Sequence, residues 1–384
     1  MLDVLVVGAG PTGLAAAAAL ARRGVSVGVV EKRTCGWTTS RAAVVHSGTL
    51  RVLDALDVTA PLLATGLRVH RFAVRERERD RPLLDVDFGR LDGPHPYALL
   101  TPQWRTEEAL LARARALGVD VSSGEELLDV RPDGDTVLVT TDRDRLRCRY
   151  VVGADGVAGT VREHAGIARP GRRLAESFAL ADVRLADAGA EPGVALHVSR
   201  AGSLVAAALP DGLVRIVAPL AEAPAEPGAA FVQQLLDTRG PREAPRVAEV
   251  VWSSRFRVSH GLAETFRRGR IVLVGDAAHV HSPAGGQGMN LGLRDAVSLA
   301  EPLAAALAGR EAELDAWAAS RRRAAARVLR LTRGLTVLGA GTPLARGAAV
   351  GALAVAARAG TVRAVAARRL AGLDDPAVAG APAG

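Results

Sequence analysis

The sequence of 384 residues predicts an α/β fold, in which a parallel-sheet domain is interrupted by a mostly antiparallel sheet and followed by C-terminal helices. Residues 2–30 read as strand, helix and strand, which is typical of a βαβ unit. Between about residues 171 and 258, strand-like runs are broken by glycine and proline, as in an antiparallel sheet. A last buried strand at residues 271–274 resembles the first domain again, and from residue 292 onward the chain is almost wholly helical.

The composition predicts a folded protein of roughly two domains. Hydrophobic residues make up 49% of the chain, which excludes intrinsic disorder. The formal charge of +8 does not indicate nucleic-acid binding, because Lys32 is the only lysine and the arginines are spread among acidic residues. The arginine run at residues 321–323 lies in a predicted helix, and we expect it to form a solvated face.

The two cysteines, Cys35 and Cys148, have neither metal-ligand nor CxxC spacing, so no disulfide framework or metal site is predicted. The chain opens directly with a strand, and its apolar late stretch is much shorter than the roughly 20 residues of a membrane span. We therefore expect a cytoplasmic protein, monomer or homodimer, with a small-molecule substrate and with no nucleic-acid partner and no integral membrane segment.

The predicted domains are discontinuous in sequence. The nucleotide-binding domain takes residues 1–68, 99–170 and 263–335, and the inserted substrate domain takes residues 69–98 and 171–262. C-terminal helices and a tail take residues 336–384, and the tail is expected to be loose from residue 376 onward.

The first motif is Gly8-Ala9-Gly10-Pro11-Thr12-Gly13, a GxGxxG sequence between a strand and a helix, called the nucleotide loop below. Its glycines permit a tight turn, a close approach of the backbone to a pyrophosphate, and close packing of the helix on the sheet. Glu31 ends the next strand, where an acid hydrogen-bonds ribose hydroxyls and disfavours a 2′-phosphate. Lys32 and Arg33 follow, and Arg33 leaves a phosphate contact open, so these residues do not decide between NADH and NADPH. The motif predicts a Rossmann-like dinucleotide site.

A second glycine-rich match, at residues 339–345, has no acid at the right distance and lies among predicted helices. It is interpreted as a helix–helix turn.

Two further motifs follow predicted buried strands. Residues 148–162 read CRYVVGADGVAGTVR, and residues 270–296 read RIVLVGDAAHVHSPAGGQGMNLGLRDA. Gly275-Asp276 puts a carboxylate at the carboxyl edge of the sheet, where ligands of open α/β folds bind. The flavin segment, residues 283–290, contains Gly285, Gly286 and Gly288 and leads into a helix. Its backbone N–H groups suit a flavin edge, and the helix N-terminus favours negative charge there.

Together the three motifs resemble the class A flavin monooxygenases of the para-hydroxybenzoate hydroxylase family, and in particular its bacterial aromatic and polyketide hydroxylases, over residues 1–335. The resemblance implies a non-covalently bound FAD, transient docking of NAD(P)H, and reaction of the reduced flavin with O₂. The resulting C4a-hydroperoxide would hydroxylate an aromatic, phenolic or polyketide-like molecule. The absence of a second credible nucleotide motif fits this expectation.

The resemblance also implies roles for individual residues. Arg41 would contact the FAD phosphates, Gln103 the region of the ribityl chain, Asp276 the ribityl or pyrophosphate portion, and Asp155 the pyrophosphate. Residues 285–290 would line the isoalloxazine. Pro283 and Gly285 would lie where oxygen reacts. The expected cofactor-binding set is Gly8, Gly10, Pro11, Thr12, Gly13, Glu31, Lys32, Arg33, Arg41, Gln103, Asp155, Gly275, Asp276, Pro283, Gly285, Gly286, Gln287, Gly288, Met289 and Asn290.

The chain departs from the family pattern at Ala158 and Gly159, where the family has a polar or basic residue and a serine, and this puts the nicotinamide contact there in doubt. His279 matches a structural position of the family, and His281 is expected near the site without a catalytic role.

The substrate is expected between the flavin and the inserted sheet, against apolar residues of the runs 194–209 and 214–218. Because the chain has two tyrosines and six phenylalanines, an aliphatic wall is predicted there. Because the C-terminal residues have a helical pattern, we also expect that the thioredoxin-like domain of larger family members is absent. The sequence does not identify the substrate or a base that deprotonates it.

Three alternatives remain open. A related FAD-dependent reductase or dehydrogenase would act without oxygen insertion. A non-catalytic flavoprotein would serve as a binding module. A membrane-peripheral enzyme would use the basic, apolar helices at residues 346–373. A flavin halogenase is disfavoured, because the chain lacks the WxWxIP segment and a lysine near the flavin end.

Overall fold

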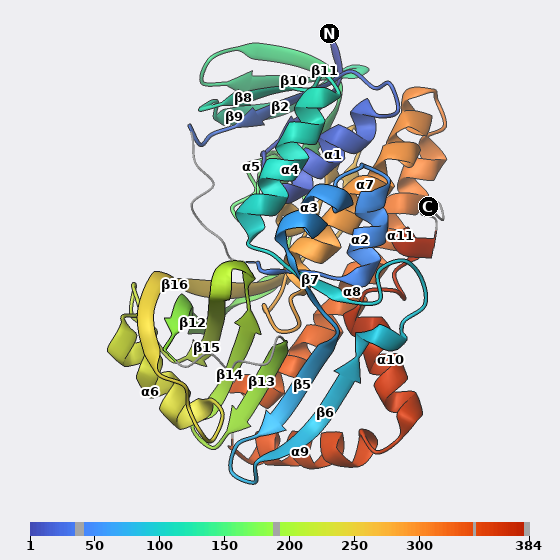
Figure 1. Ribbon diagram of the computed structural model, residues 1–384. Coiled ribbons are helices and arrows are strands. Elements are labelled where there is room, and N and C mark those ends of the chain that lie inside the picture. Colours follow the sequence, from blue (N-terminus) through green and yellow to red (C-terminus); the bar gives the residue numbers. More distant parts are fainter. Residues whose placement is uncertain (35–41, 187–192, 341–342, 380–384) are drawn as a thin grey trace.

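The computed structural model describes residues 1–34, 42–186, 193–340 and 343–379 (Figure 1). Within these residues the strands form two sheets of eight strands each and one small sheet of three. The chain passes from the first large sheet to the second and back, so each is assembled from separate stretches of sequence. The predicted fold class, a Rossmann-like domain with an inserted, mostly antiparallel sheet and C-terminal helices, is confirmed.

The first sheet is the nucleotide-binding sheet, with the order β17-β18-β11-β1-β2-β8 and β9 and β10 attached through β11. The strands from β18 to β8 run parallel, and the hairpin of β10 and β11 is antiparallel. The bounds are β1 (Leu2–Val7), β2 (Val27–Glu31), β8 (Asp120–Ser123), β9 (Leu127–Asp133), β10 (Thr136–Thr141), β11 (Arg145–Gly153), β17 (Arg267–Arg268) and β18 (Ile271–Leu273).

Helices pack around this sheet. Helix α1 packs against α4 and α7, and α7 packs against α8. Residues 13–20 of α1 are all buried, and because most of them are alanine, the helix can approach its neighbours closely. The bounds are α1 (Pro11–Ala21), α4 (Gln103–Ala116), α5 (Thr160–His164), α7 (Gln287–Leu307) and α8 (Glu311–Ala340).

The second sheet has the order β19-β16-β12-β15-β14-β13-β5-β6. Within the described strands of this second sheet, only the pairing of β13 with β5 is parallel, and the other pairings are antiparallel. Helix α6 (Ala229–Arg239) packs against β16. The strand bounds are β5 (Arg71–Glu76), β6 (Arg81–Asp87), β12 (Gly171–Leu185), β13 (Val194–Ser199), β14 (Gly202–Ala208), β15 (Leu213–Leu220), β16 (Val247–Leu262) and β19 (His279–Val280).

A small sheet joins the two large ones, with β7 between β3 and β4. Two helices, α2 and α3, follow β3 and are separated near Asp57, whose φ of 57° is left-handed. The bounds are β3 (Val44–Val45), β4 (Leu67–Val69), β7 (Ala98–Leu100), α2 (Ser47–Asp54) and α3 (Thr59–Thr65), with 3₁₀ turns η1 (Phe88–Arg90), η2 (Pro210–Gly212) and η3 (Gly275–Ala277).

The C-terminal helices α9 (Pro343–Ala356) and α10 (Gly360–Leu370) lie outside β6 and pack against it (Figure 1). The prediction of a loose tail from residue 376 is wrong at its start, because α11 (Pro376–Ala379) packs against α2 and α7. No single helix of the described residues is long and apolar enough to cross a membrane; residues Ala349–Ala356 and Gly360–Leu370, bent by 111°, pass that test of length and composition only as a pair.

The expectation of a solvated arginine run is wrong for its first member. Arg322 and Arg323 are exposed, but Arg321 is 2% exposed and forms ion pairs with Asp295 and Asp375. The partners come from α7 and from the segment before α11, so local charge patterning carried no signal of this burial.

Substituting Gly13 tests the close packing of α1 on the nucleotide loop. A Cβ atom at Gly13 would lie 1.9 Å from the Gly8 carbonyl oxygen, so Gly13→Ala must displace the loop. We expect the free energy of unfolding to fall by about 1–3 kcal/mol in urea titrations. The control is Gly351→Ala in α9, where a Cβ atom meets nothing within 4 Å. That variant should be neutral or slightly more stable, and equal effects of the two substitutions would contradict the packing argument.

Candidate functional site

Four predicted site residues lie at or just beyond the carboxyl ends of strands in the nucleotide-binding sheet. In the parallel register, Val7 is paired with Gly153 and Val30, and Gly153 is paired with Leu273. Gly8 and Glu31 directly follow Val7 and Val30, and Asp155 and Asp276 come two and three residues after Gly153 and Leu273. Parallel strands present their carboxyl ends at one edge, so four segments far apart in sequence meet there.

One large cavity starts at this edge and continues to the second sheet, with a volume of about 640 Å³. Most of the predicted cofactor-binding residues line it: Gly8, Gly10, Pro11, Thr12, Glu31, Lys32, Arg33, Gln103, Asp155, Asp276, Pro283, Gly285, Gly286, Gly288 and Met289. Gly13, Gly275, Gln287 and Asn290 lie behind the wall, and Arg41 lies outside the described residues. The structure therefore brings together residues that the sequence assigned to one ligand.

At the nucleotide loop, the wall is open where a pyrophosphate is expected. A Cβ atom at Gly10 would meet nothing within 4 Å, and Gly10 directly precedes the N-terminus of α1. Free N–H groups of a helix N-terminus favour an anion at this position.

Glu31 is 7% exposed and is held in place by hydrogen bonds from two residues, Ala9 and Arg33. The Ala9 backbone N–H donates to its Oε2 at 2.8 Å, and Arg33 Nε donates to its Oε1 at 2.8 Å. Burial alone would raise the pKa of Glu31, but the hydrogen bonds from Arg33 and from the Ala9 backbone lower it by more than burial raises it. The net shift of the pKa is therefore downward. The carboxylate thus stays ionised and can accept hydrogen bonds, and Arg33 forms an ion pair with it.

Asp155 supplies a test of whether a polar ligand fits. Its Oδ2 accepts a hydrogen bond from the Val161 backbone N–H at 2.9 Å, whereas its Oδ1 is buried without a partner among the described residues. Burial raises the pKa of this carboxyl group. A buried acceptor without a partner is costly unless something fills its place. A bound nucleotide would do so, and the donors and glycines around it fit FAD.

The flavin segment is held from behind by hydrogen bonds. His46 Nε2 lies 2.9 Å from the Gly285 carbonyl oxygen and donates to it, since a carbonyl only accepts. Asn290 Nδ2 donates to the carbonyl oxygens of Val44 and Gly286 at 2.8 and 2.7 Å. The side chains of Gln287 and Asn290 thus support the loop from the interior, although the sequence placed them along the flavin.

Gln103 lines the cavity at the start of α4. It accepts a hydrogen bond from the Ala42 backbone N–H at 3.1 Å and donates one to Glu107 Oε1 at 2.9 Å. Glu107 also lines the cavity, and burial raises the pKa of this carboxyl group. Sequence reasoning missed Glu107 because an acid within a helix usually faces solvent; its position four residues after Gln103, on the same helix face, was the available signal.

The far half of the cavity is bounded by the second sheet. Residues of the runs predicted for the substrate wall are present there: Val194, Leu196, Ser203, Val205, Ala207, Arg215 and Val217. The predicted aliphatic wall is wrong, however, because Phe72, Phe88, Phe178 and Phe256 also line the cavity. Phe178 and Phe256 are cross-strand partners, and their rings stack at a centroid distance of 5.1 Å.

A buried ion pair closes the cavity wall beside this apolar half. Arg215 donates to both oxygens of its cross-strand partner Asp182, at 2.7 and 2.8 Å, and also to the Ala42 carbonyl oxygen at 3.1 Å. The contact joins the second sheet to the chain that follows residue 41. Across the described residues, no group of three or more histidine, cysteine, aspartate or glutamate side chains is arranged to hold a metal ion.

Comparison with known proteins yields one family and several relatives. A family model described as an FAD binding domain matches residues 1–332. The chain is 39% identical over 348 residues to the 6-methylpretetramide 4-monooxygenase of Streptomyces rimosus, covering 88% of this chain and 62% of that protein. It is 38% identical over 347 residues to a rifampicin monooxygenase of Streptomyces venezuelae, covering 87% and 71%. The chain thus spans about two thirds of the length of these curated relatives.

Among solved structures, p-nitrophenol 4-monooxygenase from Pseudomonas putida DLL-E4 superposes with a TM-score of 0.86 at 25% identity. The superposition covers 98% of this chain and 99% of the other.

The buried His46 makes stability depend on pH. Burial lowers its pKa to about 4, whereas an unfolded histidine titrates near 6.5. Stability from neutral His46 is therefore complete above pH 6.5 and is lost as the pH falls towards 4. We expect His46→Gln to flatten the fall in unfolding free energy between pH 7 and pH 4.5 by about 1–3 kcal/mol, measured by urea titration of the FAD-free protein. Parallel curves for the variant and the wild type would contradict the buried neutral state.

Proposed function

Because the chain belongs to the FAD-binding-domain family of flavin-dependent monooxygenases, we propose that it hydroxylates an aromatic, phenolic or polyketide-like small molecule. The co-substrates of the proposed reaction are NAD(P)H and O₂. The observation that carries the proposal is the single cavity that joins the nucleotide loop and Glu31 to the flavin segment and then to a chamber with stacked phenylalanines.

Each end of the cavity has a task in this proposal. Glu31 would accept hydrogen bonds from ribose hydroxyls, and the N-terminus of α1 at Gly10 would receive the pyrophosphate, with Asp155 beside it. Asp276 would hold the ribityl region, and the backbone of residues 283–289 would line the isoalloxazine. Arg41 remains a proposed phosphate contact by family resemblance.

When bound, FAD supplies the redox chemistry, which is acceptance of a hydride from NAD(P)H and activation of O₂. The protein has to orient the substrate and keep water out. The apolar wall of Phe72, Phe178, Leu180 and Phe256 serves both purposes, because it offers flat surfaces to a ring and no hydrogen bonds to water.

A histidine at the cavity suits a substrate hydroxyl group. His281 Nδ1 lies 2.9 Å from the Ser282 carbonyl oxygen and must donate to it, so Nε2 carries no proton in the neutral ring. Burial lowers the pKa of His281 to about 4, which keeps the ring neutral at pH 7. His281 lines the cavity, and its Nε2 has no partner among the described residues. We propose that Nε2 accepts a hydrogen bond from a phenolic hydroxyl group, a role that the sequence did not assign to it.

The names of the relatives span a wide range of substrate size, from p-nitrophenol to 6-methylpretetramide and rifampicin. The stacked Phe178 and Phe256 favour a flat aromatic ring system within that range.

The first test of the function is oxygen transfer. With FAD and a panel of phenols and polycyclic aromatic polyketides, NADH or NADPH should bleach the flavin faster when a substrate is present. In ¹⁸O₂ the product should contain one labelled oxygen atom, measured by mass spectrometry. A reduced flavin that does not consume O₂ would sink the proposal, and a reduced or dehydrogenated product without oxygen uptake would favour the reductase alternative.

A second test concerns the aromatic wall. Phe178→Ala removes one ring of the stacked pair, so we expect the KM for the aromatic substrate to rise roughly three- to tenfold with a smaller change in kcat. Phe231→Ala in α6 is the matched control, because Phe231 packs in a separate cluster beneath the second sheet. An equal rise in KM for both variants would show that the wall has no specific part in binding.

A further inference from the structure

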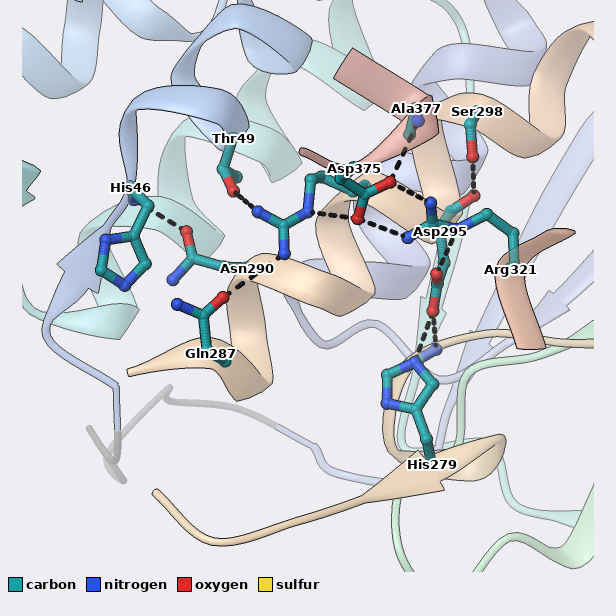
Figure 2. Close-up of polar contacts among 12 residues, drawn as sticks. His46, Thr49, His279, Gln287, Asn290, Asp295, Ser298, Arg321, Asp375 and Ala377 are labelled. Atoms are coloured by element: carbon teal, nitrogen blue, oxygen red, sulfur yellow. Dashed lines mark hydrogen bonds and ion pairs between the residues drawn. The ribbon is translucent and has the colours of Figure 1, made fainter. Parts of the chain in front are cut away.

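Behind the flavin segment lies a buried network of two arginines and two aspartates, shown in Figure 2. Arg294 and Asp295 belong to α7, Arg321 belongs to α8, and Asp375 precedes α11. All four are at most 8% exposed. Arg321 Nε donates to Asp295 Oδ1 at 2.7 Å, and Arg321 Nη2 donates to Asp375 Oδ2 at 3.1 Å. Arg294 Nε lies 3.0 Å from Asp375 Oδ2 as an ion pair. The charges alternate in sign, and the two positive charges balance the two negative ones.

The network holds both segments that are assigned to the flavin. On one side, Asp295 Oδ2 lies 2.5 Å from His279 Nε2 and accepts from the Gly275 backbone N–H at 3.4 Å. On the other side, Arg294 Nη2 donates to Gln287 Oε1 at 3.4 Å. Gln287 Nε2 in turn donates to the Gly285 carbonyl oxygen at 3.2 Å. A chain of contacts thus runs from Asp375 through Arg294 and Gln287 to the backbone of the flavin segment.

The C-terminal segment, residues 370–375, also contacts this region directly. Gln287 Nε2 donates to the Leu370 carbonyl oxygen at 2.9 Å, and the Gly48 backbone N–H donates to the Ala371 carbonyl oxygen at 2.9 Å. A Cβ atom at Gly372 would lie 1.9 Å from Arg294 Nη1, so a larger residue would have to displace the guanidinium, and the φ of 72° at Gly372 also favours glycine. Leu370 itself lines the cavity.

The charge state of the network follows from these contacts. Burial alone would raise the pKa of Asp375, but Arg294 and Arg321 lower it well below its usual range. Asp295 is likewise buried, and Arg321 and His279 lower its pKa overall. Both aspartates are therefore ionised, and removing one charge leaves a buried arginine without its partner.

We propose that the C-terminal segment is part of the flavin site, and that Asp375 is a positioning residue that acts on the flavin segment through Arg294 and Gln287. The family model ends at residue 332, so Asp375 lies outside the part of the chain that it matches. The assignment rests on the proposed FAD site. In this arrangement the C-terminus stabilises the two arginines that orient the backbone facing the isoalloxazine.

The test measures FAD affinity by quenching of flavin fluorescence, the visible spectrum of the bound flavin, and thermal unfolding of the FAD-free protein. Asp375→Asn should raise the Kd for FAD on the order of tenfold, as for loss of about one hydrogen bond, and should shift the flavin bands. Asp374→Asn is the matched control. Asp374 is adjacent but half-exposed and is paired with Arg368 at the surface, so the Kd and spectrum of this variant should equal those of the wild type.

Two double variants separate positioning from folding. Arg294→Met with Asp375→Asn restores charge balance, because the ion pair of Arg321 with Asp295 remains. We expect the unfolding temperature to recover while the Kd stays raised. Gln287→Leu with Asp375→Asn should weaken FAD binding no more than the stronger single variant, because both residues act along one path.

Three results would overturn the proposal: a Kd within twofold of the wild type for Asp375→Asn, wild-type affinity and spectrum in the charge-balanced variant, or additive losses for Gln287 and Asp375. None of these readouts involves turnover. A failure to hydroxylate any substrate would therefore count against the proposed function but would not bear on the role of Asp375 in FAD binding.

Discussion

The register of the parallel sheet is the constraint on which the site depends. Because Val7, Gly153 and Leu273 lie side by side, the segments that follow β1, β11 and β18 emerge at one edge and at one height. Each segment is short and rich in glycine or acid, and none of them forms a ligand site alone. A slip of one residue in β11 or β18 would point the side chains to the opposite faces and separate the motifs. The buried apolar strands therefore position chemistry that lies outside the strands themselves.

The rest of the molecule completes what the sheet edge begins. The second sheet supplies the apolar half of the cavity, and Arg215 ties it to the chain beside the nucleotide half. Helix α7 carries the end of the flavin segment in its first turn and Asp295 of the charge network in its third turn. The C-terminal helices α9 and α10 cover β6, and the segment after them places Asp375 in that network. Distant parts of the chain thus act on the same few backbone groups.

The sequence predicted what is local and missed what is assembled over long distances. Gly8, Glu31, Asp155 and Asp276 each lie at or just after the carboxyl end of a strand that the sequence predicts, so their meeting at one edge follows from the parallel pairing of those strands. The partners of Arg321 lie 26 and 54 residues away, and nothing near residue 321 indicates burial. Likewise, the number of phenylalanines in the sequence does not predict where they lie in the fold. Phe178 and Phe256 become neighbours only through the pairing of β12 with β16.

The most direct measurement of the central claim is a crystal structure of the protein with FAD. The account predicts adenosine ribose beside Glu31, pyrophosphate at the N-terminus of α1, and the isoalloxazine against Gly285 and Gly286, with its free face towards Phe178 and Phe256. The His46 and Gln287 contacts to Gly285 should persist in that complex. An FAD bound with the opposite orientation, or outside this cavity, would contradict the account.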